Sequence, residues 1–120
     1  MDMTRKGSSR TVVLVGKYAI KIPRMNTWET FLRGLLSNYQ EVRFSKLKYP
    51  YLCPILFYLP GGFMTIMPRC DILETRHMSR QQLLLLLKSE ERAGRCMPVE
   101  PKHDSFGLLP NGRLVAVDYG

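Results

Sequence analysis

Three charged side chains, far apart in the sequence, have the chemistry needed to bind a polyphosphate and a metal ion. Lys21 lies in a β-rich run, Glu41 in a segment with helical spacing, and Asp118 in the terminal Asp118-Tyr-Gly120. A bound polyphosphate needs a cation in a fixed position, that cation needs a carboxylate beside it, and magnesium needs a hard oxygen ligand. The three residues supply one of each. Each also has a simpler interpretation: a strand-edge lysine, a solvated helix carboxylate and a turn residue.

The segment around Lys21 predicts a β-hairpin. Two runs rich in β-forming residues, 10–15 and 17–23, are separated by Gly16. Because side chains alternate along a strand, Ala19 and Lys21 share the face opposite to that of Tyr18, Ile20 and Ile22. Lys21 is therefore expected to lie among apolar neighbours.

The segment around Glu41 predicts a helix from about residue 27 to residue 46. Asn26 and Glu29 have the spacing of a capping box at its start. An apolar stripe recurs at helical intervals and is expected to face the core: Trp28, Leu32, Leu35, Tyr39 and Val42. A second stripe beside it would hold the carboxylate at the edge of the buried face: Gly34, Asn38, Glu41 and Ser45. From there Glu41 can reach a neighbouring strand.

Two further hairpins are predicted. Residues 55–59 and 63–67 are joined by Gly61-Gly62, and Pro68 ends the second run. Residues 105–109 and 113–117 are joined by a turn with Asn111-Gly112, the strongest turn signal in the chain.

A second helix is predicted between these hairpins, from about residue 80 to residue 93. Ser79 and Gln82 form a capping box at its start, and Gly94 marks its end. Its five consecutive leucines, 83–87, cover every face of the helix, so we expect it to be largely enclosed. The predicted order of elements is β-β-α-β-β-α-β-β.

These residues and their order resemble the protein-kinase-like fold, in the compact form found among small bacterial and phage proteins. The resemblance covers about residues 7–120 and rests on Ala19-Ile-Lys21, the helix with Glu41, the hinge-like Met67-Pro-Arg-Cys-Asp71 and the closing Asp118-Tyr-Gly120. It implies an α+β fold. A kinase-like N-lobe, made of an antiparallel sheet and one long helix, would be followed by a reduced C-terminal part of one helix and a β-hairpin.

The resemblance also implies roles for individual residues. In that family the strand lysine binds the α- and β-phosphates of ATP and pairs with the helix glutamate, while the aspartate of Asp-Phe-Gly binds magnesium. Lys21, Glu41 and Asp118 match these positions, with Tyr119 in place of the family's phenylalanine. Met67 would contact the nucleotide from the hinge. The implied cofactors are ATP and Mg²⁺.

We expect one domain over residues 1–120, because a chain of 120 residues supports one core of modest size. Following the resemblance, residues 1–9 would be a flexible arm, 10–67 the N-lobe-like part, 68–71 the hinge-like segment and 72–120 the reduced C-lobe. This last part would end at the Asp-Tyr-Gly turn.

The catalytic loop departs from the family's pattern. Aligning Ser105-Phe-Gly with the family's Asn-Phe-Gly places Glu100 at the catalytic aspartate and Ser105 at the asparagine that binds the second metal ion. Glutamate is longer by one methylene, and serine is a poor substitute for an amide oxygen. A shift of register would instead nominate Asp104. The phosphate-covering loop is reduced to Gly7-Ser-Ser-Arg10, and no activation segment follows Gly120, so we expect a truncated kinase-like core.

The charge balance favours an acidic partner. The chain has 18 Lys and Arg residues against 10 Asp and Glu residues, a formal charge of +8, which suits an acidic protein, a nucleotide or a nucleic acid. Near the long helix, basic and aromatic residues are interleaved, as in proteins that bind single-stranded nucleic acid: Arg33, Arg43, Lys46 and Lys48, with Tyr39, Phe44, Tyr49 and Tyr51. A solvated helix face with core tyrosines explains the same residues, because the charges form no continuous block. Arg5, Lys6 and Arg10 add a basic arm.

The cysteines and histidines carry a weaker signal. Cys70 and His77 have the same spacing as Cys96 and His103, but structural zinc sites place two ligands closer together, so we expect no zinc site. With Cys53 the chain has three cysteines and no CxxC pair, and no apolar run approaches the length that crosses a bilayer. We expect a cytoplasmic protein without a membrane partner.

Some residues of the kinase pattern are present in this sequence and others are replaced. Together they indicate a truncated kinase-like protein without efficient phosphotransfer, which acts by binding or regulation and could still hold a nucleotide. Its size and charge would suit a phage or mobile-element inhibitor. One alternative is a minimal Mg-ATP-dependent phosphotransferase, in which Glu100 or Asp104 is the general base and a partner supplies the substrate platform. A second alternative is a basic nucleic-acid-binding module.

Overall fold

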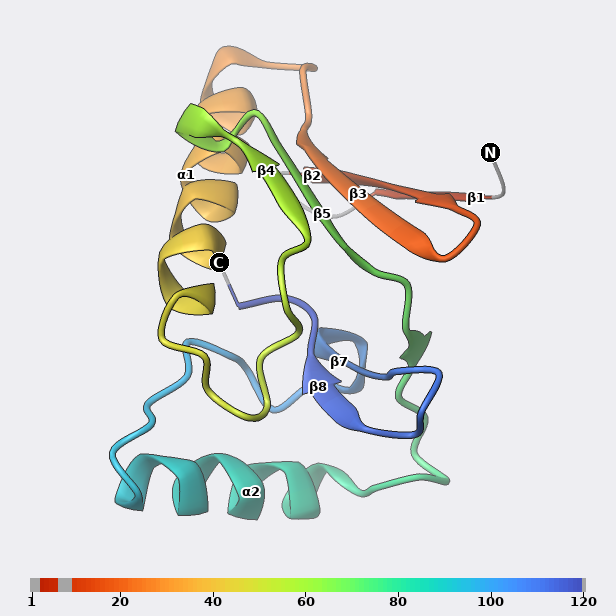
Figure 1. Ribbon diagram of the computed structural model, residues 1–120, viewed down its shortest axis with the longest axis vertical. Coiled ribbons are helices and arrows are strands. Elements are labelled where there is room, and N and C mark those ends of the chain that lie inside the picture. Colours follow the sequence, from red (N-terminus) through yellow and green to blue (C-terminus); the bar gives the residue numbers. More distant parts are fainter. Residues whose placement is uncertain (1–2, 7–9, 120) are drawn as a thin grey trace.

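The chain forms two antiparallel sheets, each accompanied by one helix (Figure 1). A computed structural model describes residues 3–6 and 10–119. The larger sheet has the strand order β1-β2-β3-β5-β4, and these strands are Met3–Lys6, Arg10–Val15, Tyr18–Pro23, Met64–Pro68 and Phe57–Leu59. The smaller sheet has the order β6-β7-β8, with strands Asp71–Ile72, Phe106–Leu108 and Leu114–Ala116. The predicted α+β class, with an antiparallel sheet and one long helix, is confirmed.

β2 and β3 form the hairpin that the sequence predicts. The two residues Gly16 and Lys17 connect them, and Gly16 has a φ of 55°, in the left-handed region that favours glycine. This connection sets Val12 opposite Lys21 and Arg10 opposite Pro23. Lys21 is buried, on the face that alternation predicts, and Arg10 lies on the same face of the sheet.

The start of the chain differs from the flexible arm that we expected. β1 pairs with β2 over its whole length, from Met3 opposite Leu14 to Lys6 opposite Thr11. Charged residues such as lysine are common on edge strands. The remaining residues of the expected arm, 1–2 and 7–9, lie outside the described residues.

α1, Trp28–Ser45, lies against the larger sheet (Figure 1), but its buried face is not the predicted one. The predicted apolar stripe is largely exposed: Trp28 is 73% exposed and Tyr39 is 47% exposed. The buried positions belong mainly to the small and polar stripe: Thr30, Gly34, Asn38, Glu41 and Val42. The expectation that the apolar stripe faces the core is therefore wrong.

The N-terminus of α1 also differs from the expected capping box. Thr27 is the N-cap, and its hydroxyl accepts a hydrogen bond from the N–H of Thr30 at 3.1 Å. Asn26 lies one residue before the cap, so the proposed pair of Asn26 and Glu29 is wrong.

α2, Arg80–Arg92, begins with the predicted capping box of Ser79 and Gln82. The prediction that its leucine run is enclosed is wrong. Leu83 is fully buried, whereas Leu85 is 67% exposed. Leu83 and the half-buried Leu87 pack on the core, whereas Leu84 and Leu85 are exposed.

The core lies where the end of the larger sheet meets the smaller sheet and α2. Its buried members come from distant segments: Leu52, Cys53, Met67, Leu73, Leu83, Met97, Phe106, Val115, Ala116 and Tyr119. Short 3-10 helices at Pro60–Gly62 and His103–Ser105 precede β5 and β7. Within the described part of the chain, no helix combines the length and apolar character needed to span a membrane.

Candidate functional site

Lys21 and Glu41 form a buried ion pair between β3 and α1. The Nζ atom of Lys21 lies 3.1 Å from both carboxylate oxygens of Glu41, and the two residues are 5% and 0% exposed. The same Nζ also donates to the backbone carbonyl of Val117. An ammonium group has three N–H donors, so this set of acceptors uses all of them.

Arg10 adds a second cation to this site. Its Nη1 atom lies 2.8 Å from Oε1 of Glu41 and donates to Oδ1 of Asn38 at 3.1 Å, while Nη2 lies 2.6 Å from Oδ1 of Asp118. Arg10 is only 7% exposed. The sequence interpretation, which assigned it to a basic arm, missed this role. The spacing of the predicted hairpin could have indicated this role, because it places Arg10 and Lys21 on one face of the sheet.

Asp118 lies at the solvent-exposed end of the network. Its side chain is 56% exposed, whereas that of Glu41 is fully buried. The next residue, Tyr119, fixes this segment against α1. Its backbone N–H donates to Oε2 of Glu41 at 3.1 Å, and its hydroxyl donates to the carbonyl of Cys53 at 2.7 Å. Glu41 thus accepts hydrogen bonds or ion pairs from three different segments of the chain.

Asn38 is a further member that the sequence placed in a stripe without assigning it a role. Besides accepting from Arg10, its Nδ2 donates to the carbonyls of Gly62, at 2.9 Å, and Lys21, at 3.3 Å. This fully buried amide links α1 to two strands and to the turn before β5. It explains why the polar stripe of α1, rather than its apolar stripe, faces the sheet.

The charges hold one another in the ionised state. Burial works to raise the pKa of Glu41, but Lys21 and Arg10 outweigh it, so that this pKa lies below its ordinary value of 4.5. Burial works to lower the pKa of Arg10, yet Glu41 and Asp118 raise it above its ordinary value. Burial lowers the pKa of Lys21, which Glu41 opposes. Two cations and two carboxylates leave the network neutral as a whole.

The residues nominated for the catalytic loop lie on the surface near this network. Glu100 and Asp104 are exposed, and Lys102 between them lies 3.1 Å from Oε2 of Glu100. The pKa of Lys102 is raised, mainly by this hydrogen bond and further by the charges of Glu100, Asp104 and Asp118. Glu100 therefore pairs with Lys102, and the charges of Asp104 and Asp118 also act on this lysine.

Ser105 and Met67, the other two nominated residues, are both buried. Ser105 is 7% exposed, and its carbonyl accepts from the N–H of Val117 at 2.8 Å. Met67 is 1% exposed and belongs to the core, where β5 ends before the hinge-like segment.

The two cysteine and histidine pairs of equal spacing do not form a metal site among the described residues. His103 contacts the carbonyl of Met78 through Nε2, and His77 accepts from the N–H of Glu74 through Nδ1. Among residues 3–6 and 10–119, no three side chains of His, Cys, Asp or Glu are grouped so as to hold a metal ion.

In this arrangement the residues do not fit a magnesium-bound polyphosphate. Lys21 has no N–H group left for a phosphate oxygen, and Asp118, the candidate metal ligand, is bridged to the guanidinium of Arg10. The network connects four parts of the fold: β2, β3, α1 and the segment after β8. No protein-family model matches the chain, and no curated protein is significantly similar to it in sequence.

Proposed function

We propose that this chain is a kinase-like binding protein without efficient phosphotransfer. The resemblance to kinases implies that Lys21, Glu41 and Asp118 share one site, and the buried network, in which Arg10 links Glu41 to Asp118, supports this. The proposed lack of phosphotransfer rests on the position of Arg10. It puts a protein cation where the resemblance implies a metal ion.

The chemical difference between the two cations supports the proposal. Magnesium bridges a carboxylate and phosphate oxygens because it accepts several oxygen ligands at once in octahedral geometry. A guanidinium is permanently charged and donates fixed hydrogen bonds, and here it is already shared among Glu41, Asn38 and Asp118. It therefore neutralises Asp118 without leaving that carboxylate free for a metal.

The chain would then act by binding another macromolecule. The excess of positive charge, +8, suits an acidic partner. Cys53, Cys70 and Cys96 form no disulfide among the described residues, which is in keeping with a reducing compartment, and we place this function in the cytoplasm.

Incubation with radiolabelled ATP and Mg²⁺ tests the proposal. We expect no phosphate transfer to the chain itself or to a general protein substrate above the level of a blank. Asp118→Asn and Lys21→Ala serve as matched controls. Transfer by the wild type that both variants abolish would overturn the proposal.

The second candidate function is a minimal phosphotransferase that needs a partner. The observation that favours it is the position of Glu100 and Asp104, which act on the same lysine as Asp118. Phosphoryl transfer in kinases uses a carboxylate that accepts the proton of the substrate hydroxyl, and Glu100 or Asp104 would have that role. For this function, Arg10 would have to leave Asp118 when a partner or nucleotide binds.

A further inference from the structure

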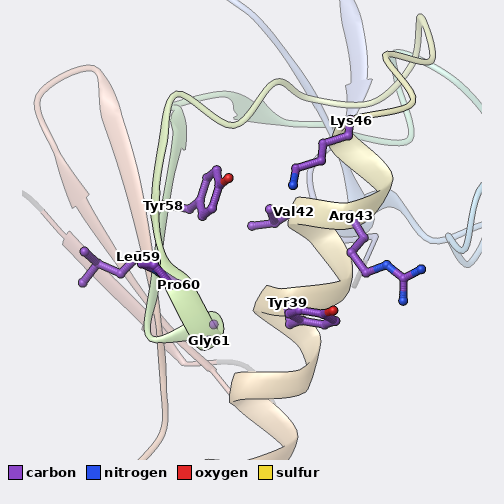
Figure 2. A pocket seen from close by; sticks show the side chains of 9 residues that line it. Tyr39, Val42, Arg43, Lys46, Tyr58, Leu59, Pro60 and Gly61 are labelled. Carbon is purple, nitrogen blue, oxygen red and sulfur yellow. The ribbon is translucent and has the colours of Figure 1, made fainter.

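A pocket of about 400 Å³ lies between the C-terminal half of α1 and β4 (Figure 2). The helix contributes Tyr39, Arg43 and Lys46 to it, and β4 contributes Tyr58. The turn Pro60–Gly62 lines one end. Figure 2 shows the ring of Tyr58 directed toward the helix, whereas the neighbouring Leu59 points away from the pocket.

Each tyrosine of this pocket has its own cation. The guanidinium carbon of Arg43 lies 5.9 Å from the ring centre of Tyr39, and Nζ of Lys46 lies 5.8 Å from that of Tyr58. The two tyrosines are 47% and 42% exposed. No acidic residue lines the pocket, and within the described residues neither cation forms a salt bridge. The two charges are therefore available to an anionic ligand.

The walls of the pocket are held in place by buried contacts. Asn38 of α1 donates to the carbonyl of Gly62 at 2.9 Å. Gly62 has a φ of 85° and packs so closely on the helix that a Cβ atom there would lie 2.1 Å from the carbonyl oxygen of Leu35. The turn and the helix thus lie closer together than any side chain at this position would allow. A site built on fixed elements loses little conformational entropy when a ligand binds.

We propose that this pocket binds single-stranded nucleic acid, with bases stacked on Tyr39 and Tyr58 and phosphates bound by Arg43 and Lys46. The ring-and-cation unit occurs twice, and a nucleotide strand likewise repeats a flat base and a charged phosphate. Proteins that bind single strands combine aromatic platforms with a basic groove in this way. An acidic peptide would satisfy the cations but would offer no flat partner to the two exposed rings.

This inference deepens the proposed function, since it names the macromolecule that the chain binds and the surface that binds it. It rests on the binding part of that proposal alone. Whether Arg10 keeps a metal ion from Asp118 has no bearing on the pocket, so the phosphotransfer assay and the experiments below can fail independently.

The first experiment separates base stacking from charge. Fluorescence anisotropy would compare binding of labelled dT12 with that of an abasic 12-mer, which keeps the phosphates but has no bases. We expect the full chain to prefer dT12 by about tenfold or more, because the stacking of a base on an aromatic ring adds to the affinity. Tyr58→Leu and Tyr39→Leu should each remove much of this preference. Trp28→Leu, which changes an exposed ring outside the pocket, is the matched control and should leave it unchanged.

The second experiment counts the phosphate contacts. The logarithm of the affinity for dT12 falls with the logarithm of the salt concentration, with a slope of about 0.7 for each phosphate neutralised on a single strand. Arg43→Gln and Lys46→Gln should each reduce the slope by about that amount. Lys88→Gln, an exposed lysine on α2, should leave it unchanged.

Three results would overturn the proposal. The first is equal affinity for dT12 and the abasic strand, and the second is absence of binding at low salt. The third is competition by polyglutamate as effective as that by unlabelled dT12, together with no effect of the tyrosine variants. That last result would assign the surface to an acidic protein instead.

Discussion

Arg10 donates a hydrogen bond of 2.6 Å to Asp118, a residue 108 positions later in the chain. Through its other nitrogen it also pairs with Glu41. The strand β2 is thereby tied to the segment that follows β8. Because Glu41 is fully buried and Asp118 is half-exposed, the guanidinium connects the protein interior with the solvent side of the network.

Replacing Arg10 tests whether its cation keeps a metal ion away from Asp118. We expect 5 mM Mg-ATP to leave the melting temperature of the wild type unchanged and to raise that of Arg10→Ala. A ligand at a hundredfold excess over its Kd stabilises the folded state by about 2.7 kcal/mol. Thermal unfolding followed by tryptophan fluorescence measures the shift.

The double variant Arg10→Ala, Asp118→Asn is the control, because it removes the carboxylate that would hold the ion. Its melting temperature should not respond to Mg-ATP. An equal response of the wild type and Arg10→Ala would contradict a blocking role for Arg10 and would favour the phosphotransferase alternative.

The buried pairs predict an asymmetry between Glu41 and Lys21. Glu41→Gln leaves two buried cations without their shared carboxylate, and we expect a loss of about 3–5 kcal/mol in the free energy of unfolding. Lys21→Met should cost less, because Arg10 still neutralises Glu41. Urea unfolding monitored by circular dichroism measures both. The control is Glu29→Gln in the exposed first turn of α1, expected to change stability by less than about 0.5 kcal/mol. A larger loss for Lys21→Met than for Glu41→Gln would refute the shared-carboxylate model.

Much of the fold follows from local signals in the sequence. The connections Gly16-Lys17 and Gly61-Gly62 join pairs of β-rich runs, and each pair forms a hairpin, as predicted. Lys21 is buried on the face that alternation assigns to it. These features depend on neighbouring residues and backbone stereochemistry, so they can be predicted without knowledge of the tertiary contacts.

The rotation of α1 could not be predicted in this way. Hydrophobic periodicity favoured a buried Trp28 and Tyr39, yet the hydrogen bonds of Asn38 and the ion pairs of Glu41 turn the neighbouring polar stripe toward the sheet. Their partners lie on distant segments, so the pairing carries no local pattern. Arg10 was missed for a related reason: a single basic residue at a strand end is usually solvated.

The lowered pKa of Glu41 predicts sensitivity to acid. Its carboxylate is stabilised in the folded state relative to the unfolded state, so its contribution is complete above the ordinary pKa of 4.5. That contribution is lost as the pH falls through the lower pKa of the folded state, when the proton taken up breaks both ion pairs. Urea unfolding between pH 7 and pH 3 should show stability falling below about pH 4.5. Glu41→Gln should flatten this dependence, whereas Glu29→Gln should retain it; equal slopes for all three proteins would contradict the assignment.

Thr65 offers a test in the stabilising direction. Its side chain is fully buried on β5, opposite Lys21, and its hydroxyl has no hydrogen-bond partner among the described residues. A buried hydroxyl left unsatisfied costs about 1–3 kcal/mol. Thr65→Val keeps the shape and removes that group, so we expect the free energy of unfolding to stay the same or rise by about 1 kcal/mol. Thr65→Ser, which keeps the hydroxyl and removes a methyl group, should be less stable than the wild type. A clear loss for Thr65→Val would show that the hydroxyl has a partner.

Gly62 connects the stability of the fold with the nucleic-acid pocket. Alanine at this position would be strained by its φ of 85°, and its Cβ would also lie 2.1 Å from the carbonyl oxygen of Leu35, so the turn and α1 would have to separate. Gly112→Ala is the matched control, because its φ is 83° but nothing lies within 4 Å of the added atom. The φ strain alone costs about 1–2 kcal/mol, and overpacking adds about 1–3 kcal/mol. We therefore expect Gly62→Ala to lose more stability than Gly112→Ala, as measured by urea unfolding.

At temperatures where both variants remain folded, Gly62→Ala alone should also weaken binding of dT12, since Tyr39 and Tyr58 lie on the two walls that it pushes apart. Equal stability of the two variants, with equal affinity for dT12, would mean that the close approach at Gly62 does not build the pocket.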